Sequence, residues 1–149
     1  MKSRIFHTES EEQTVALGER LAAELPAKAV VLLIGNLGAG KTTLAKGIVK
    51  GLGAAQPDDV SSPTFTLIHE YSPSVYHIDL YRLDQPEQVA TLGLDEIFDR
   101  QAVVLIEWGE RFPQLMPQAR IEIRIRTIGD ESREIEVGPT THNPAPTTL

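Results

Sequence analysis

The chain of 149 residues has the length of one domain, and its apolar fraction of 41% and charged fraction of 23% are those of a globular protein. It carries 14 Lys and Arg against 21 Asp and Glu, a net charge of −7, so most of its surface repels nucleic acid. It contains no cysteine, which excludes disulfides, thiolate metal sites and cysteine nucleophiles.

Two patterns bear on where the protein works. The longest continuous apolar run, Ala29–Ile34, is far too short to span a bilayer. The first residues contain no apolar stretch of signal-peptide length before the charged residues that begin at Glu9. We therefore expect a cytoplasmic protein that does not contact a membrane. We also expect any role around RNA to be indirect, through a protein partner.

Hydrophobic periodicity and turn residues predict strands that alternate with helices. Apolar side chains at helical spacing follow Thr8 and Glu11, which have the spacing of a capping box at a helix start. Continuous apolar runs are typical of parallel strands covered on both faces, whereas strict alternation of Ile with charged residues indicates a half-buried strand. In chain order, we expect a short edge strand at 4–7, a helix at about 9–24, a central strand at 29–34, a helix at about 41–51, a hairpin of strands at 65–71 and 75–80, short helical pieces within 85–99, a buried strand at 102–106, and a hairpin of strands at 120–126 and 133–137.

These elements predict a single α/β domain over residues 1–138. The sequence contains no internal repeat and no linker that would divide this range. Residues 139–149 lack core-forming side chains, and we expect them to form a disordered tail.

The segment between the first central strand and the second helix has the complete P-loop pattern, Gly35-x4-Gly40-Lys41-Thr42. Glycines let successive backbone N–H groups point at phosphate oxygens, and the helix that follows presents its positive N-terminal end to the same phosphates. The lysine can reach the β- and γ-phosphates, and the threonine hydroxyl can bind magnesium. The residues expected to contact nucleotide here are Gly35, Asn36, Leu37, Gly38, Ala39, Gly40, Lys41, Thr42 and Thr43.

Two carboxylates at predicted strand ends could complete a magnesium–nucleotide site. Glu107 follows the apolar run 102–106, where it could bind the metal directly or through water, or orient an attacking water. Asp79 lies at the end of the strand 75–80 and could do either. For each residue, the alternative is an ordinary surface carboxylate at a strand end.

Other candidates carry weaker signals. Thr64, in the loop Ser61-Ser62-Pro63-Thr64, could sense the γ-phosphate or simply belong to a Ser- and Pro-rich turn. Trp108, the only tryptophan, could pack in the core or cover the nucleotide as an aromatic lid. The histidines show no metal-ligand spacing, so we predict structural roles for all four, His7, His69, His77 and His142.

Five motifs follow one another along the chain: Gly35-Asn-Leu-Gly-Ala-Gly-Lys-Thr-Thr-Leu44, Ser62-Pro-Thr-Phe-Thr-Leu67, Tyr76-His-Ile-Asp-Leu-Tyr-Arg-Leu83, Leu92-Gly-Leu94 and Ile106-Glu-Trp108. In this order they resemble the TsaE family, the small bacterial ATPases required for threonylcarbamoyladenosine modification of tRNA. The resemblance covers residues from about 10 to 137. It implies a three-layer P-loop NTPase-like α/β fold with a mixed central β-sheet flanked by helices. It also implies weak hydrolysis of ATP with Mg²⁺, and association with a TsaB–TsaD pair that modifies the tRNA.

Residue roles follow from the resemblance by position. Lys41 and Thr42 match the residues that bind phosphate and magnesium, and Glu107 resembles the metal-site acid. Asp79 and Thr64 match residues implicated in hydrolysis, and Trp108 one at the nucleotide and partner surface. The helix start and the last hairpin approach the nucleotide in the family, and we assign Glu11 and Arg133 there. Asn36 stands where the family commonly has Asp. A loop that binds phosphate through backbone N–H groups should tolerate this exchange, but hydrolysis is altered if that Asp assists water activation or partner contact.

The main alternative is a small-molecule or nucleotide kinase on the same fold. Such kinases often close a basic lid over the phosphates, but the arginines here are dispersed and no insertion has the size of a lid. A nucleotide-dependent scaffold without hydrolysis is a third possibility. The chain has no Asn-Lys-x-Asp stretch of the kind that reads guanine in GTPases, although nothing in its composition selects adenine positively.

Overall fold

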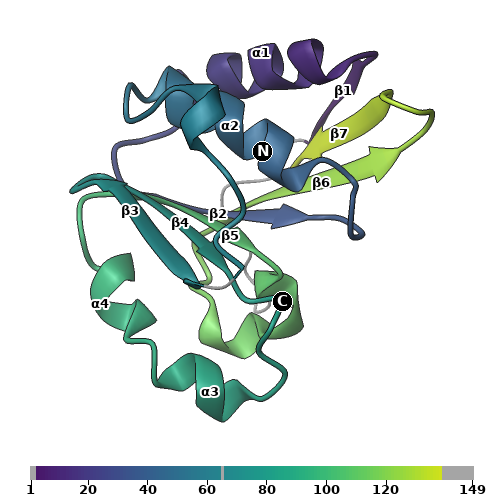
Figure 1. Ribbon diagram of the computed structural model, residues 1–149. Coiled ribbons are helices and arrows are strands. Elements are labelled where there is room, and N and C mark those ends of the chain that lie inside the picture. Colours follow the sequence, from purple (N-terminus) through teal and green to yellow (C-terminus); the bar gives the residue numbers. More distant parts are fainter. Residues whose placement is uncertain (1–2, 65, 139–149) are drawn as a thin grey trace, which may run out of the picture.

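The computed structural model describes residues 3–64 and 66–138, and within them seven strands and four α-helices form one layered unit (Figure 1). The predicted tail at 139–149 lies outside the described residues. Among the described helices, none combines the length and the apolar content needed to cross a bilayer. In chain order the elements are β1 Arg4–Thr8, α1 Glu11–Ala22, β2 Ala29–Ile34, α2 Lys41–Gly51, β3 Ile68–Ser72, β4 Val75–Asp79, α3 Pro86–Ala90, α4 Leu94–Phe98, β5 Val103–Glu107, β6 Ile121–Thr127 and β7 Arg133–Val137, with short 3-10 turns at Pro57–Asp59, Gly109–Arg111 and Pro113–Leu115.

All seven strands belong to one mixed sheet in the order β1-β7-β6-β2-β5-β4-β3. The central strands β6, β2, β5 and β4 run parallel, and antiparallel pairs extend the sheet on both sides. This arrangement confirms the predicted mixed sheet, the two hairpins and the edge position of the first strand. Because parallel strands end at the same edge of the sheet, the carboxyl ends of β2, β4 and β5 meet there, and Asp79 lies directly opposite Glu107 in the register.

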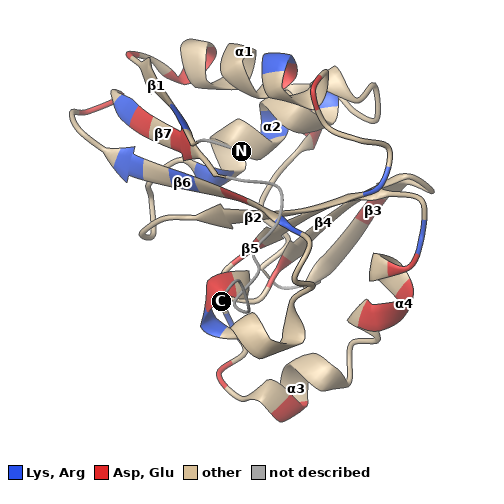
Figure 2. Ribbon diagram, turned by 180° about the vertical axis from the view of Figure 1, so that it is seen from behind, with Lys and Arg blue, Asp and Glu red and all other residues tan. Residues whose placement is uncertain are grey.

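Helices cover both faces of the sheet. On one face α1 and α2 pack over a core that includes Val31, Leu33 and Leu105, and on the other α3, α4 and the 3-10 turns at 109–111 and 113–115 pack over Leu32, Ile78 and Ile106 (Figure 1). Seen from behind in Figure 2, α3 and α4 carry acidic side chains, whereas β6 and β7 carry both signs. The two cores flank the parallel strands, which explains their continuous apolar sequences.

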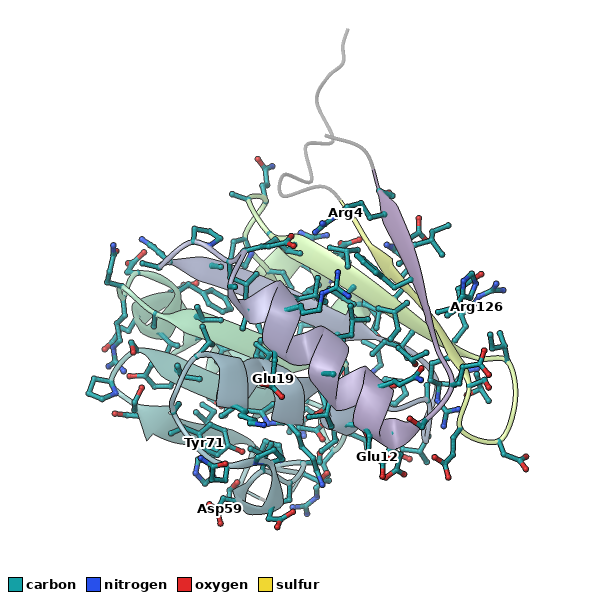
Figure 3. All side chains as sticks on the ribbon, turned by 90° about the horizontal axis from the view of Figure 1, so that it is seen from above. Arg4, Glu12, Glu19, Asp59, Tyr71 and Arg126 are labelled. Carbon is teal, nitrogen blue, oxygen red and sulfur yellow. The ribbon has the colours of Figure 1, made fainter. Side chains whose placement is uncertain are left out.

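The two helices on the upper face touch backbone to backbone. A Cβ atom placed on Gly47 of α2 would lie 2.0 Å from the carbonyl oxygen of Val15 in α1, so only glycine permits this approach. The crossing is also held by an ion pair of 3.1 Å between Lys50 and Glu19, whose side chain is labelled on α1 in Figure 3. This contact fixes the axis of α2, and therefore the direction in which its N-terminus points.

Two predictions about where an element begins are wrong in detail. The capping box predicted at Thr8 does not form: Ser10 caps α1 by accepting a hydrogen bond from the backbone of Gln13, because Thr8 still belongs to β1 and pairs instead with Thr14. The strand predicted from residue 65 begins only at Ile68, and residue 65 itself lies outside the described part of the chain.

The alternation of β6 also fails at one position. Glu122 falls on the polar face of the predicted strand, yet it is only 8% exposed. Arg120 and Arg124 each donate a hydrogen bond of 2.9 Å to its carboxylate. Burial alone would raise the pKa of Glu122, but the bonds and charges of the two guanidinium groups outweigh it and lower that pKa. A carboxylate with two cationic partners is therefore accommodated where the pattern predicts exposure.

Candidate functional site

A cavity of about 390 Å³ lies where the P-loop, the ends of β4 and β5 and the start of α1 converge. Most of the predicted site residues line it, although they come from distant parts of the sequence. The residues that it brings together are Glu11, Leu37, Gly38, Gly40, Lys41, Thr42, Thr43, Thr64, Asp79, Glu107, Trp108 and Arg133.

Three predicted residues of the loop lie elsewhere. Gly35, Asn36 and Ala39 do not line this cavity; they border a separate one of about 410 Å³, whose other walls come from β6 and β7. The loop therefore presents different residues to two separate cavities. Asn36 thus lines a different cavity from the one that contains Lys41.

The local geometry of the loop follows from its glycines. Gly40 adopts a φ of 105°, in the left-handed region that other residues avoid, and it immediately precedes the first turn of α2. The N–H groups in that first turn have no acceptor within the helix, and the helix dipole adds partial positive charge at the same place. The N-terminus of α2 could therefore bind an anion at the wall of the cavity.

Lys41 is held inside the site, with 4% of its surface exposed. Its Nζ donates a hydrogen bond of 2.7 Å to the carbonyl oxygen of Gly35 and lies 3.4 Å from the centre of the Trp108 ring. Burial lowers the pKa of Lys41, while the negative charges of Glu107, Glu110 and Asp79 oppose this effect. An ammonium group has three N–H donors, and the bond to Gly35 uses one of them.

The two predicted carboxylates have different surroundings. Glu107 is 3% exposed, and its Oε2 accepts hydrogen bonds from Thr42 Oγ1 at 3.2 Å and from His77 Nε2 at 2.7 Å. Asp79 is 2% exposed and accepts from Thr64 at 3.0 Å, from Ser62, and from the backbone of Tyr81 at 2.8 Å. Neither is an ordinary surface carboxylate, and Asp79 ties the loop that carries Thr64 to the end of β4.

The donor set suits a magnesium ion that is held largely by a ligand. Within the described residues, no group of three or more His, Cys, Asp and Glu side chains could hold a metal by itself. Thr42 and Glu107 instead place a hydroxyl and a carboxylate oxygen side by side on the cavity wall. Magnesium prefers oxygen ligands and commonly takes one or two from protein and the rest from phosphates and water, so these two residues fit it.

Trp108 forms part of the rim of the cavity and also packs, partly buried, against the core on the α3 and α4 side of the sheet. Its φ of 67° is rare for a bulky residue and turns the chain sharply after β5. Its ring lies 5.3 Å from that of Tyr81, and the Arg111 guanidinium lies 5.2 Å from its centre. Arg111 also donates hydrogen bonds of 2.7 Å to the carbonyls of Leu80 and Tyr81, so the aromatic rim is fastened to the end of β4.

The opposite rim is formed by the start of α1 and by the last hairpin, which are far apart in the sequence. Arg133 of β7 donates a hydrogen bond of 2.7 Å from Nε to the carbonyl of Ala39 in the P-loop. The backbone N–H of Glu11 donates to the side chain of Glu131 at 3.3 Å, which joins the start of α1 to the last hairpin. Both assigned residues, Glu11 and Arg133, therefore lie at the cavity.

Sequence reasoning did not select several residues of the site. Thr14, Ser62, Tyr81 and Glu131 also line the cavity. Ser62 belongs to the loop from which Thr64 was selected. Its hydroxyl contacts that of Thr64 and, like Thr64, donates a hydrogen bond to Asp79. The contact between His77 and Glu107 was missed as well, although His77 and Asp79 are two residues apart in a strand and so share a face.

Comparisons with known proteins agree with the geometry. The family model described as "Threonylcarbamoyl adenosine biosynthesis protein TsaE" matches residues 8–135. The chain is similar to a tRNA threonylcarbamoyladenosine biosynthesis protein TsaE from Bacillus subtilis, with 43% identity over 91% of this chain and 85% of that protein. It is similar to another from a Nostoc species, with 45% identity over 86% of this chain and 81% of that protein.

A solved structure gives the same result. The crystal structure of Bacillus subtilis YdiB superposes with a TM-score of 0.76 and 37% sequence identity, covering 93% of this chain and 86% of that one. Since the family match includes the loop, both carboxylates and the aromatic rim, the chain belongs to the TsaE family.

Proposed function

We propose that the chain is a magnesium-dependent protein that binds and hydrolyses ATP in the biosynthesis of threonylcarbamoyladenosine on tRNA. The observation that supports this most strongly is the convergence of Lys41 and Thr42 with Asp79 and Glu107 on one cavity. Both the names of the relatives and the family description place those proteins in this modification.

The phosphates would lie at the N-terminus of α2. There the backbone N–H groups of the loop donate to phosphate oxygens, and Lys41 moves from the carbonyl of Gly35 to the phosphate charge. Arg133 adds a second cation at the opposite rim. The ring of Trp108, released from the ammonium, is available to cover the ligand and to exclude water.

Thr42 and Glu107 would hold Mg²⁺, which supplies charge neutralisation of the phosphates when it is bound. Asp79 has a separate task. Its two oxygens accept hydrogen bonds from Ser62, Thr64 and Tyr81, so it sets the position of the Thr64 hydroxyl beside the cavity. We expect hydrolysis by the protein alone to be slow and a partner protein to change its rate.

We further propose that this partner is a TsaB–TsaD pair and that contact with tRNA is indirect, in a cytoplasmic setting. The net charge of −7 opposes direct binding to an RNA backbone. The exposed side chains of Leu37 and Tyr81, which are 70% and 43% accessible, lie next to the nucleotide cavity and offer apolar contact to a protein.

The test is the release of phosphate from ATP, measured with and without purified TsaB–TsaD. We expect slow release by the protein alone, a changed rate when the pair is added, and loss of magnesium-dependent release in Glu107→Ala. Glu87→Ala, on the exposed surface of α3, is the matched control and should behave as the native protein. Rapid phosphoryl transfer to a small acceptor without binding to TsaB–TsaD would instead establish the kinase alternative.

A further inference from the structure

His77 is a buried polar side chain without an evident structural task. It lies in the middle of β4 and is 0% exposed. On this strand it shares the α2-facing side of the sheet with Val75 and Asp79. In the register, His77 lies opposite Leu105, two pairs before Asp79 and Glu107 along the strands, so its ring lies beneath the floor of the nucleotide cavity.

The hydrogen bonds of the ring point in one direction only. Its Nε2 lies 2.7 Å from Oε2 of Glu107, while Nδ1 is buried and has no hydrogen-bond partner within the described part of the chain. With no acceptor at Nδ1, the proton belongs on Nε2, from which it is donated to the carboxylate. If His77 only filled space in the core, an apolar side chain would serve as well. Such a side chain would also avoid burying a nitrogen that has no hydrogen-bond partner.

The contact fixes the orientation of Glu107. Thr42 donates to the same oxygen, Oε2, at 3.2 Å, whereas Oε1 accepts no hydrogen bond from the described residues. Two donors at Oε2 hold the carboxylate plane and leave the lone pairs of Oε1 for a ligand in the cavity. If Thr42 turns its hydroxyl to a metal, the bond from His77 remains and keeps the carboxylate from rotating.

We propose that His77 is a positioning residue, which orients Glu107 toward a divalent cation bound together with the nucleotide. This inference rests on the proposed function, since it requires a metal at Thr42 and Glu107. Groups that donate to a metal-binding side chain commonly set its orientation, and their loss typically weakens metal affinity by about 10- to 100-fold. Because phosphates supply part of the coordination here, we expect an effect of about tenfold.

The experiment measures how binding of a fluorescent ATP analogue depends on the concentration of Mg²⁺. His77→Phe keeps a planar aromatic ring but removes the donor, and we expect it to raise the half-saturating Mg²⁺ concentration about tenfold, with nucleotide affinity in EDTA unchanged. His77→Gln carries an amide donor at nearly the position of Nε2 and should restore most of the native Mg²⁺ dependence. Val75→Ala, on the same face of β4, is the control for a simple packing defect and should not change it.

The outcomes separate this inference from the function on which it rests. If the native protein shows no effect of Mg²⁺ on nucleotide binding, the proposed function is wrong. If the native protein responds to Mg²⁺ and His77→Phe responds equally, or if Gln is no closer to native than Phe, the positioning role is wrong. Should the Phe variant fail to fold, His77→Asn, which is too short to reach Glu107, replaces it and must differ from Gln in the same direction.

Discussion

Replacing Lys41 by Met should separate stability from nucleotide binding. The variant loses the hydrogen bond to Gly35 and the contact with the Trp108 ring, which are worth about 1.5–3 and about 1–2 kcal/mol respectively. The variant also carries no buried charge at this position. Lys41 is 4% exposed, and removing its ammonium group from water costs several kcal/mol. These effects oppose each other, so we expect the free energy of unfolding to change by less than about 1 kcal/mol.

Nucleotide binding has no such compensation. One charge-assisted hydrogen bond to phosphate is worth about 1.5–3 kcal/mol, and each 1.4 kcal/mol is a factor of ten, so ATP affinity should fall by about 10- to 150-fold. The assays are denaturant unfolding and titration with a fluorescent ATP analogue. Lys46→Met, further along α2 and not on the cavity wall, is the control. A Lys41→Met protein that is much less stable but binds ATP normally would refute the reasoning.

Two further substitutions test the framework of the site. Gly47→Ala should destabilise the protein by roughly 1–3 kcal/mol in urea unfolding, because its Cβ would meet the Val15 carbonyl at 2.0 Å. This clash outweighs the better helix propensity of alanine. Unchanged stability would show that the two helices separate freely. Burial raises the pKa of Glu110 above 4.5, so its stabilising contribution is full below pH 4.5 and is lost as the pH rises through the folded-state pKa. Glu110→Gln should therefore unfold at a higher temperature than the native protein near neutral pH, and this advantage should shrink toward pH 4.5; a constant difference would contradict the assignment.

Much of the fold could be predicted because the signals are local. The run at 29–34 and that at 102–106 are apolar throughout, a pattern that is typical of strands covered on both faces. The start of α1 was misplaced since Thr8 and Ser10 are both good caps, and the pairing of β1 with β7 decides between them. The burial of Glu122 depends on Arg120, whose side chain folds over it, and periodicity has no access to such a contact.

The chemistry of the site was predictable where residue type and strand position agree. The P-loop pattern and the two carboxylates at strand ends are of this kind, since parallel strands bring their ends together. The sequence could not show that Trp108 lies over Lys41, because this depends on the left-handed turn that Trp108 itself adopts. His77 was assigned a structural role for a similar reason: its partner, Glu107, is 30 residues away.

The most direct test of the account is a calorimetric titration of the native protein with ATP and with AMP, each with and without Mg²⁺. If the cavity at the start of α2 recognises phosphates through Lys41 and holds a metal at Thr42 and Glu107, ATP should bind at one site per chain, Mg²⁺ should tighten it, and AMP should bind far more weakly. Equal binding of ATP and AMP, or ATP binding that is indifferent to Mg²⁺, would contradict the central claim.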